Sequence, residues 1–333
     1  MKASFDLNEV KRLSFQKGKG ECCMFGKLLT KFGVKSRKGR ETAYGYVFIL
    51  PWLIGIVCFV LGPLVFSFIT SFADYNMLKV NFIGLSNYKK MFFQDQLFWK
   101  SLGNTLVYSL LNVPLVTVGG VIVAVILNKS IWGLRTFRTI YYLPSIMVGV
   151  GTYFLWMLLL DPANGLVNTL LGLIGIKGPA WLTDPNWTKP AIILMHLWGL
   201  GGQMLLYLAR LQSIPQDYYE AASLDGAGMF KKFTTITVPL LSPIIFYNLT
   251  IGIIGAFQVF QEGYIFSGDG TGKPAGSLLF YNLHLWNQAF KNFKTGYANA
   301  MCWFLFAIVM ILTVCNQKIS KKWVYYEEGD NDD

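Results

Sequence analysis

The chain has 333 residues, of which 53% are hydrophobic and only 14% charged, and its formal net charge is +11. Soluble globular domains carry about a quarter charged residues, so this composition excludes an ordinary soluble domain and is typical of a membrane protein. The excess of 29 Lys and Arg over 18 Asp and Glu would also suit a nucleic-acid-binding protein. The distribution of the charge along the chain decides between these two classes.

Residues 1–43 are predicted to form a basic arm, because eleven of the Lys and Arg residues lie there. The arm contains no apolar run of signal-peptide length, and the first long run begins at Tyr44, so we expect a retained span and no cleavable signal. The adjacent Cys22 and Cys23 leave lipidation open as an alternative. The other three cysteines lie within or at the ends of apolar runs, so a disulfide framework is not expected.

Six runs without Asp, Glu, Lys or Arg are long enough to cross a membrane, since about 30 Å of hydrocarbon requires roughly 20 helical residues. These runs are 44–73, 101–128, 139–160, 190–209, 233–261 and 295–317. Two further runs, 162–176 and 274–290, are too short or too polar and are predicted to lie at the membrane surface. The fold class is therefore predicted as all-α, a polytopic membrane protein with six transmembrane helices.

The charge bias predicts how the six spans are oriented. If the N-terminus is cytoplasmic and the spans alternate, Lys and Arg divide 20 inside to 9 outside, which follows the positive-inside rule. Both termini are then cytoplasmic, and the tail at 318–333 is a charged cytoplasmic segment. Attraction to anionic membrane lipid accounts for the basic clusters without a nucleic-acid partner.

The polar connection at 210–239, between the fourth and fifth spans, is the most informative segment of the chain. Pro215, followed by an acidic residue, is typical of a helix start. Gly226 and Gly228 are expected to end this helix, because glycine takes the left-handed cap at little cost. A second short helix over 229–236 then leads to Pro239. Helix, glycine turn and helix together predict a compact knob.

The residue pattern of this connection is Glu220-Ala221-Ala222, three residues, Gly226, nine residues, Ile236, one residue, then Val238-Pro239. It resembles the coupling loop of permease subunits of binding-protein-dependent, ATP-driven (ABC) importers, with Val238 where Leu is usual. Three further segments resemble the carbohydrate-importing members of that family: 224–227, the Arg138-Thr139-Ile140 lead into Leu143-Pro144, and Asp161 with 165–168. The resemblance covers about residues 44–320.

The resemblance implies a type I importer permease fold over 44–317, in a bacterial inner membrane. It implies a second permease, two ATPase subunits that bind ATP and Mg, and an extracytoplasmic binding protein that delivers a carbohydrate. An oligosaccharide is expected, and the outside cations and aromatic loops weakly suggest an acidic one of the alginate kind. The residues expected to couple to the ATPase are Glu220, Ala221, Ala222, Asp225, Gly226, Ile236 and Pro239.

In the family that this chain resembles, the sugar passes between polar and aromatic side chains of the later spans. The side chains of those types here are Tyr153, Trp156, Trp198, Gln203, Tyr207, Asn248, Gln258 and Gln261. Each of them also fits a purely structural role, because polar groups at membrane depth commonly hold helices together. In the fourth span, Gly199, Gly201 and Gly202 would let another helix or a ligand approach the backbone.

Other chemistry is not indicated. His196 and His284 have no Cys, Asp or Glu at ligand spacing, which disfavours a metal site. The segment 268–273 looks superficially like a phosphate-binding loop, but Pro274 stands where Ser or Thr would be needed, so we interpret it as a turn. No catalytic set is visible and no cofactor is expected in this chain. The alternative, a secondary transporter driven by an ion gradient, would need an ionisable residue within the spans, and the predicted spans offer only His196.

Overall fold

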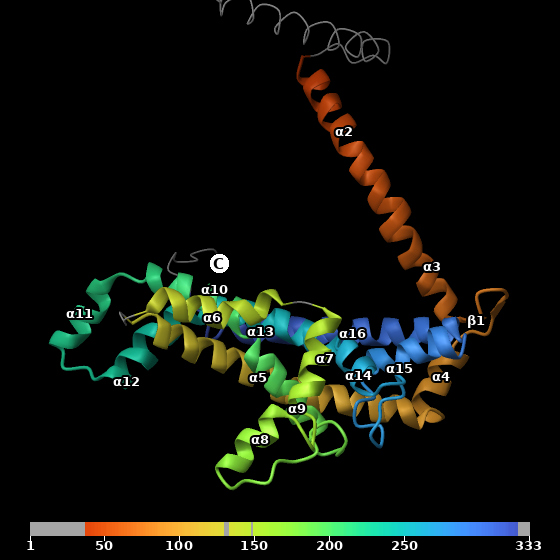
Figure 1. Cartoon of the computed structure of the whole chain (residues 1–333). Coiled ribbons are helices and arrows are strands. Elements are labelled where there is room, and N and C mark those ends of the chain that lie inside the picture. The colour runs from red at the N-terminus through yellow and green to blue at the C-terminus, as the bar shows by residue number, and fades with distance from the viewer. Residues whose placement is uncertain (1–36, 130–132, 148, 326–333) are drawn as a thin grey trace, which may run out of the picture. The chain divides into compact units, whose positions relative to one another are not determined.

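The computed structural model describes residues 37–129, 133–147 and 149–325, and the described part is mostly helical (Figure 1). The chain divides into two compact units, residues 1–67 and 68–333, and each is described by itself. The predicted features of residues 1–36, including Cys22 and Cys23, lie outside the described residues, as does the tail after residue 325.

The first unit contains most of the first predicted span. Its described part consists of α2 (Arg37–Gly55), a π-helical segment (Ile56–Leu61) and the start of α3 (Gly62–Ser71). Pro51 lies inside α2 without ending the helix. The apolar part, Tyr44–Ser71, has 28 residues and is long enough to cross a membrane, which agrees with the predicted run at 44–73.

A small antiparallel ribbon follows α3 and is a departure from the all-α prediction. Strand β1 (Ala73–Tyr75) pairs with β2 (Val80–Phe82), with Ala73 opposite Phe82. The side chain of Asn76 accepts hydrogen bonds from the backbone N–H groups of residues 78 and 79 and so closes the turn. Helix α4 (Ser86–Phe93) comes next. Strands of three residues are too short to leave a readable alternation in the sequence.

The remaining predicted spans all correspond to helices, but only two of them are single unbroken α-helices. The elements are α5 (Gln96–Leu127), α6 (Leu134–Ile146), α7 (Val150–Leu159), α9 (Thr188–Trp198), α10 (Gly201–Ser213), α12 (Met229–Lys232), the π-helical η2 (Phe233–Thr237), α13 (Val238–Phe257), α14 (Gln261–Phe266) and α16 (Thr295–Ser320). The described residues thus hold four helices long and apolar enough to cross a membrane, or up to six if each bent pair is one span.

Two predicted spans are broken at glycine. The run 139–160 is divided between α6 and α7, and Gly149, which precedes α7, has φ +116°. The run 190–209 is divided between α9 and α10, which are bent by 47°. The two runs predicted to lie at the surface contain only short helices: α8 (Leu166–Leu173) in one, and α15 (Tyr281–Trp286) with the π-helical η3 (Asn287–Lys291) in the other.

Helix α5 is the central element of the second unit, since it packs against α9, α10, α13 and α15. A close helix approach involves α10, where a Cβ added to Gly201 would lie 2.3 Å from the backbone oxygen of Tyr141 in α6. The expected close approach is thus found at Gly201. The neighbouring Gly202 has open space around it.

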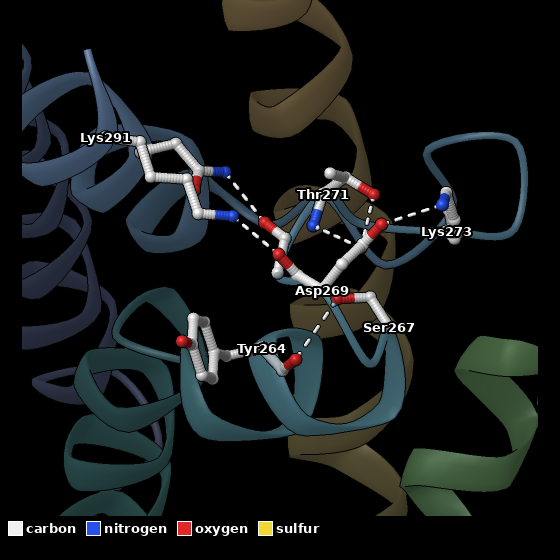
Figure 2. Close-up of polar contacts among 8 residues, drawn as sticks. Tyr264, Ser267, Asp269, Thr271, Lys273 and Lys291 are labelled. Carbon is white, nitrogen blue, oxygen red and sulfur yellow. Dashed lines mark hydrogen bonds and ion pairs between the residues drawn. The ribbon is translucent and has the colours of Figure 1, made fainter.

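The segment resembling a phosphate-binding loop is folded on itself (Figure 2). Thr271 donates backbone and hydroxyl hydrogen bonds to the Asp269 carboxylate, and Lys273 forms an ion pair with it at 2.7 Å. Lys291 donates to the backbone oxygen of Asp269, and Asn287 to that of Gly270. These contacts hold the segment as a turn, which agrees with the interpretation from its sequence.

A half-buried carboxylate fixes the start of α5. Asp95 accepts a hydrogen bond from the backbone N–H of Phe98, and its other oxygen lies 2.9 Å from His284 Nε2 and 2.7 Å from the Tyr297 hydroxyl. Burial alone would raise the pKa of Asp95, but the hydrogen bonds from His284 and Tyr297 and the charge of His284 outweigh it and lower that pKa well below its usual value. Asp95 thereby ties α5 to α15 and α16.

We expect Asp95→Asn to destabilise the protein by about 2 kcal/mol at neutral pH, because a partly buried, charge-assisted hydrogen-bond set is lost. The folded-state pKa is below the unfolded one, so the stabilisation is complete above pH ~4 and fades below it. Thermal unfolding of both proteins in detergent between pH 7 and 3 measures this difference. Equal melting temperatures at pH 7 would contradict the assignment.

Candidate functional site

The connection between α10 and α13 forms the knob that the sequence predicts. Helix α11 (Gln216–Leu224) begins directly after Pro215. It ends in a glycine turn in which Gly226 has φ +73°, and Ala227 N–H donates to the Ala222 carbonyl at 2.9 Å. This turn is the left-handed cap for which glycine is favoured. Helix α12 then continues through η2 into α13, where Pro239 stands in the first turn and needs no backbone donor.

The two helical segments of the knob, α11 and α12 with η2, are hydrogen-bonded to each other and pack against the neighbouring helices. The Tyr219 hydroxyl lies 3.0 Å from Thr237 Oγ1, and Lys232 donates to the Ser223 hydroxyl. Phe233 and Ile236 pack against a buried cluster that contains residues of α5, α10 and α13. The knob is thus held as one body with the ends of α10 and α13.

The outer face of the knob is exposed and partly apolar. Glu220 and Ala221 are exposed there, and Leu224, Met229 and Phe230 are 90%, 76% and 80% exposed. Ala222 and Ile236 are half-buried, whereas Asp225 and Gly226 are exposed at the turn. Sequence reasoning missed the three large apolar residues, although apolar side chains beside the glycines of a polar loop were the available signal. We call Glu220, Ala221, Leu224, Met229 and Phe230 the docking face.

A cavity of about 440 Å³ lies among α5, α7, α9, α10, α13 and α14, within the range of small-molecule sites. Asn112, near the middle of the 32-residue α5, is part of its wall. Its aromatic lining comes from Tyr108, Tyr153 and Trp198. Among the described residues that line it, none is Lys or Arg.

A chain of polar contacts runs along one side of the cavity. The Tyr108 hydroxyl lies 2.7 Å from His196 Nδ1, and His196 Nε2 lies 3.2 Å from Glu262 Oε1. Tyr153 donates to Gln261 at 3.1 Å and to Glu262 at 3.4 Å. The Glu262 side chain is only 11% exposed. Side chains of α7 and α9 thus contact the carboxylate carried by α14, and Tyr108 of α5 joins this chain through His196.

Two amide groups in the wall have unused acceptors. Asn112 Oδ1 and Gln203 Oε1 accept no hydrogen bond from any residue that the structure describes. Each buried acceptor without a partner costs about 1–3 kcal/mol. Both oxygens are buried, and both residues belong to the cavity wall.

The structure separates the eight candidates for the substrate path. Tyr153, Trp198 and Gln203 line the cavity. Trp156 is buried and packs edge-on against Trp198 at 5.7 Å, and Gln261 contacts Tyr153. The other three lie elsewhere: Tyr207 is fully buried against α5, Asn248 is buried in α13, and Gln258 is exposed at the end of α13.

Sequence reasoning missed Tyr108, Asn112 and Glu262. Glu262 is predicted from the sequence to begin an outside loop, whereas the structure has it buried in α14 against His196 of α9. The one available signal was His196, because a histidine is rare inside an apolar run. An ionisable residue within the membrane usually has a polar partner, so His196 could have prompted a search for one.

A family model described as "binding-protein-dependent transport system inner membrane component" matches residues 97–321, about two thirds of the chain. The chain belongs to this family. The matched region of this permease begins at α5 and includes both the knob and the cavity.

Two curated relatives of the permease support this family assignment. It is 41% identical over 300 residues to the probable ABC transporter permease protein YesP of Bacillus subtilis, covering 89% of this chain and 96% of YesP. It is 33% identical over 276 residues to the lactose transport system permease protein LacF of Rhizobium radiobacter, covering 81% and 91%.

The fold of the permease matches that of a solved transporter. A chain of a bacterial ABC transporter involved in the import of the acidic polysaccharide alginate superposes with a TM-score of 0.74 at 24% identity, covering 85% of this chain and 96% of that chain. At this identity the likeness shows the ABC permease fold alone.

Proposed function

We propose that this permease forms the translocation path for a carbohydrate, an oligosaccharide delivered by an extracytoplasmic binding protein, in an ATP-driven importer. The observation that carries the proposal is the cavity beside mid-α5, whose wall combines aromatic rings with amide acceptors that lack partners. Sugars need flat apolar surfaces together with hydrogen-bonding groups. The lactose permease relative supports the same substrate class.

The proposal includes the coupling partners. The docking face of the knob is exposed, partly apolar and firmly fastened, which suits a surface covered by another protein. We assign it to a groove on an ATPase subunit, where Glu220 pairs with a basic residue. ATP and Mg then belong to two such subunits, and a second permease completes the path.

The proposed membrane topology has six spans in a bacterial inner membrane, with both termini cytoplasmic. The spans are α2–α3, α5, α6–α7, α9–α10, α12–α14 and α16, if each bent pair crosses once. The 20 to 9 division of Lys and Arg supports the orientation, in which the knob faces the cytoplasm and the ATPase. Residues 1–43 serve as a basic arm at the membrane surface.

Filling the cavity tests the proposed path. Gly255 lines it and has no atom within 4 Å of an added Cβ, so Gly255→Phe is expected to fill the cavity without forcing the helices apart. Sugar-stimulated ATPase activity of the complete importer should fall at least tenfold while assembly stays normal. Gly151→Phe is the matched control, because Gly151 is equally open but is not part of the wall. Normal stimulation in Gly255→Phe would overturn the proposed path.

The alternative of an ion-driven transporter deserves a direct comparison, because Glu262 and His196 do place ionisable groups within the helices. The family match favours the ATP-driven importer. Uptake into proteoliposomes that requires ATP and persists after the proton and sodium gradients are abolished is the expected result.

A further inference from the structure

We infer that Glu262 is a specificity-determining residue that makes this cavity select uncharged saccharides and reject carboxylated ones. This inference rests on the proposed function, since it concerns what passes through the same cavity. It opposes the acidic substrate that the outside cations of the sequence suggest.

The charge of the cavity wall is the first argument. Glu262 is the single Asp or Glu among the described residues that line it, and the wall has neither Lys nor Arg. An ionised Glu262 gives the wall a negative charge when His196 is neutral, and no net charge when His196 is protonated. In neither state does this chain offer a sugar carboxylate a net positive charge, and like charges at short range repel more strongly beside protein than in bulk water.

The hydrogen bonds of His196 are the second argument. Its Nδ1 is engaged by the Tyr108 hydroxyl at 2.7 Å, and its Nε2 by Glu262 at 3.2 Å. Both ring nitrogens are therefore occupied, and His196 has no free N–H to offer an anion.

Three acceptors of the wall favour donors on the ligand, whereas the amide nitrogens of Asn112 and Gln203 and the indole N–H of Trp198 are donors in the same wall. Asn112 Oδ1 and Gln203 Oε1 are acceptors without partners, and the Glu262 carboxylate is an acceptor only. The Tyr153 hydroxyl already donates to Gln261 and Glu262. Hydroxyl groups of a neutral sugar complement such a wall, whereas a uronate carboxylate brings further acceptors and a negative charge.

Matched saccharide pairs test this inference. We would titrate the complete importer complex in lipid nanodiscs, without the soluble binding protein, with trigalacturonate and its methyl ester, and with trimannuronate and its methyl ester. Each pair differs essentially in charge. We expect wild type to bind at least one ester at least tenfold more tightly than the corresponding acid, as measured by calorimetry. Glu262→Gln should reduce that ratio below threefold by improving binding of the acid.

Two controls accompany the variant. Glu262→Asp keeps the charge and should keep the discrimination. Asp184→Asn removes a carboxylate that does not line the cavity, and should leave the ratio unchanged. Acids bound as tightly as esters by wild type, or a ratio unaltered in Glu262→Gln, would overturn the inference.

The same titration separates this inference from the proposed function. If wild type binds an ester and Gly255→Phe does not, the cavity is a saccharide site. The ratio of ester to acid binding then decides the inferred role of Glu262 alone. If wild type binds none of the four saccharides, the proposed path itself fails, and the inference fails with it.

Discussion

Leu224→Asp is expected to reduce ATP-driven transport more than tenfold and to release the ATPase subunit from the purified complex. Leu224 is 90% exposed at the tip of α11, and burying a leucine side chain against a partner stabilises an interface by about 1.5–3 kcal/mol. A carboxylate at that position loses this contribution and adds the cost of desolvating a charge. The measurement is the amount of ATPase subunit that co-purifies with the permease, together with sugar-stimulated ATP hydrolysis.

The matched control for Leu224→Asp is Gln216→Asp. It places the same charge in the first turn of the same helix, at the opposite end from Leu224, where an acidic side chain interacts favourably with the helix dipole. Normal assembly in Gln216→Asp, beside loss of assembly in Leu224→Asp, would assign the effect to the docking face. Full assembly of Leu224→Asp would show that this face does not bind the ATPase.

Gly201→Ala is expected to be strongly destabilising, lowering the free energy of unfolding by about 3 kcal/mol or more. The added methyl would lie 2.3 Å from the Tyr141 backbone oxygen and 2.6 Å from the Tyr142 Cα. Both neighbours are backbone atoms, so relieving the clash requires moving α6 away from α10. We expect this movement to cost more than the usual 1–3 kcal/mol of overpacking a core. Thermal unfolding in detergent measures the difference.

Gly202→Ala provides the comparison at the next residue of the same helix. No atom lies within 4 Å of its added Cβ, and alanine is favoured over glycine within a helix by about 1 kcal/mol. We therefore expect unchanged or slightly raised stability. Similar melting temperatures for the two variants would contradict the close packing of α6 against α10.

The sequence predicts the positions of the membrane helices well, because apolar runs of sufficient length need only composition to be recognised. It does not predict their breaks. The run 139–160 contains no charged residue, yet it is divided before Gly149, whose φ of +116° no hydropathy pattern reports. The packing of Gly201 against α6 likewise depends on which helix lies opposite.

In the candidate site, too, features set by local backbone geometry were predictable and features set by tertiary packing were not. The knob was predictable because Pro215, Gly226 and Pro239 act locally, through the backbone geometry each permits. The cavity was predicted only in part. A search for uncharged runs ends at any acidic residue, and so it assigned Glu262 to a loop. Its burial depends on His196 and Tyr153, which come from 66 and 109 residues away in the sequence.

The helices that hold the knob also reach the cavity. Helix α10 carries Gln203 near its beginning and leads to α11 at its end, while α13 begins at the knob and carries Gly252 and Gly255 toward its end. Thirteen residues of α10 extend about 20 Å at 1.5 Å per residue. If α10 and α13 move as rigid bodies, a displacement of the knob also moves Gln203 and the two glycines in the cavity wall. No relay of side chains between the knob and the cavity is then needed.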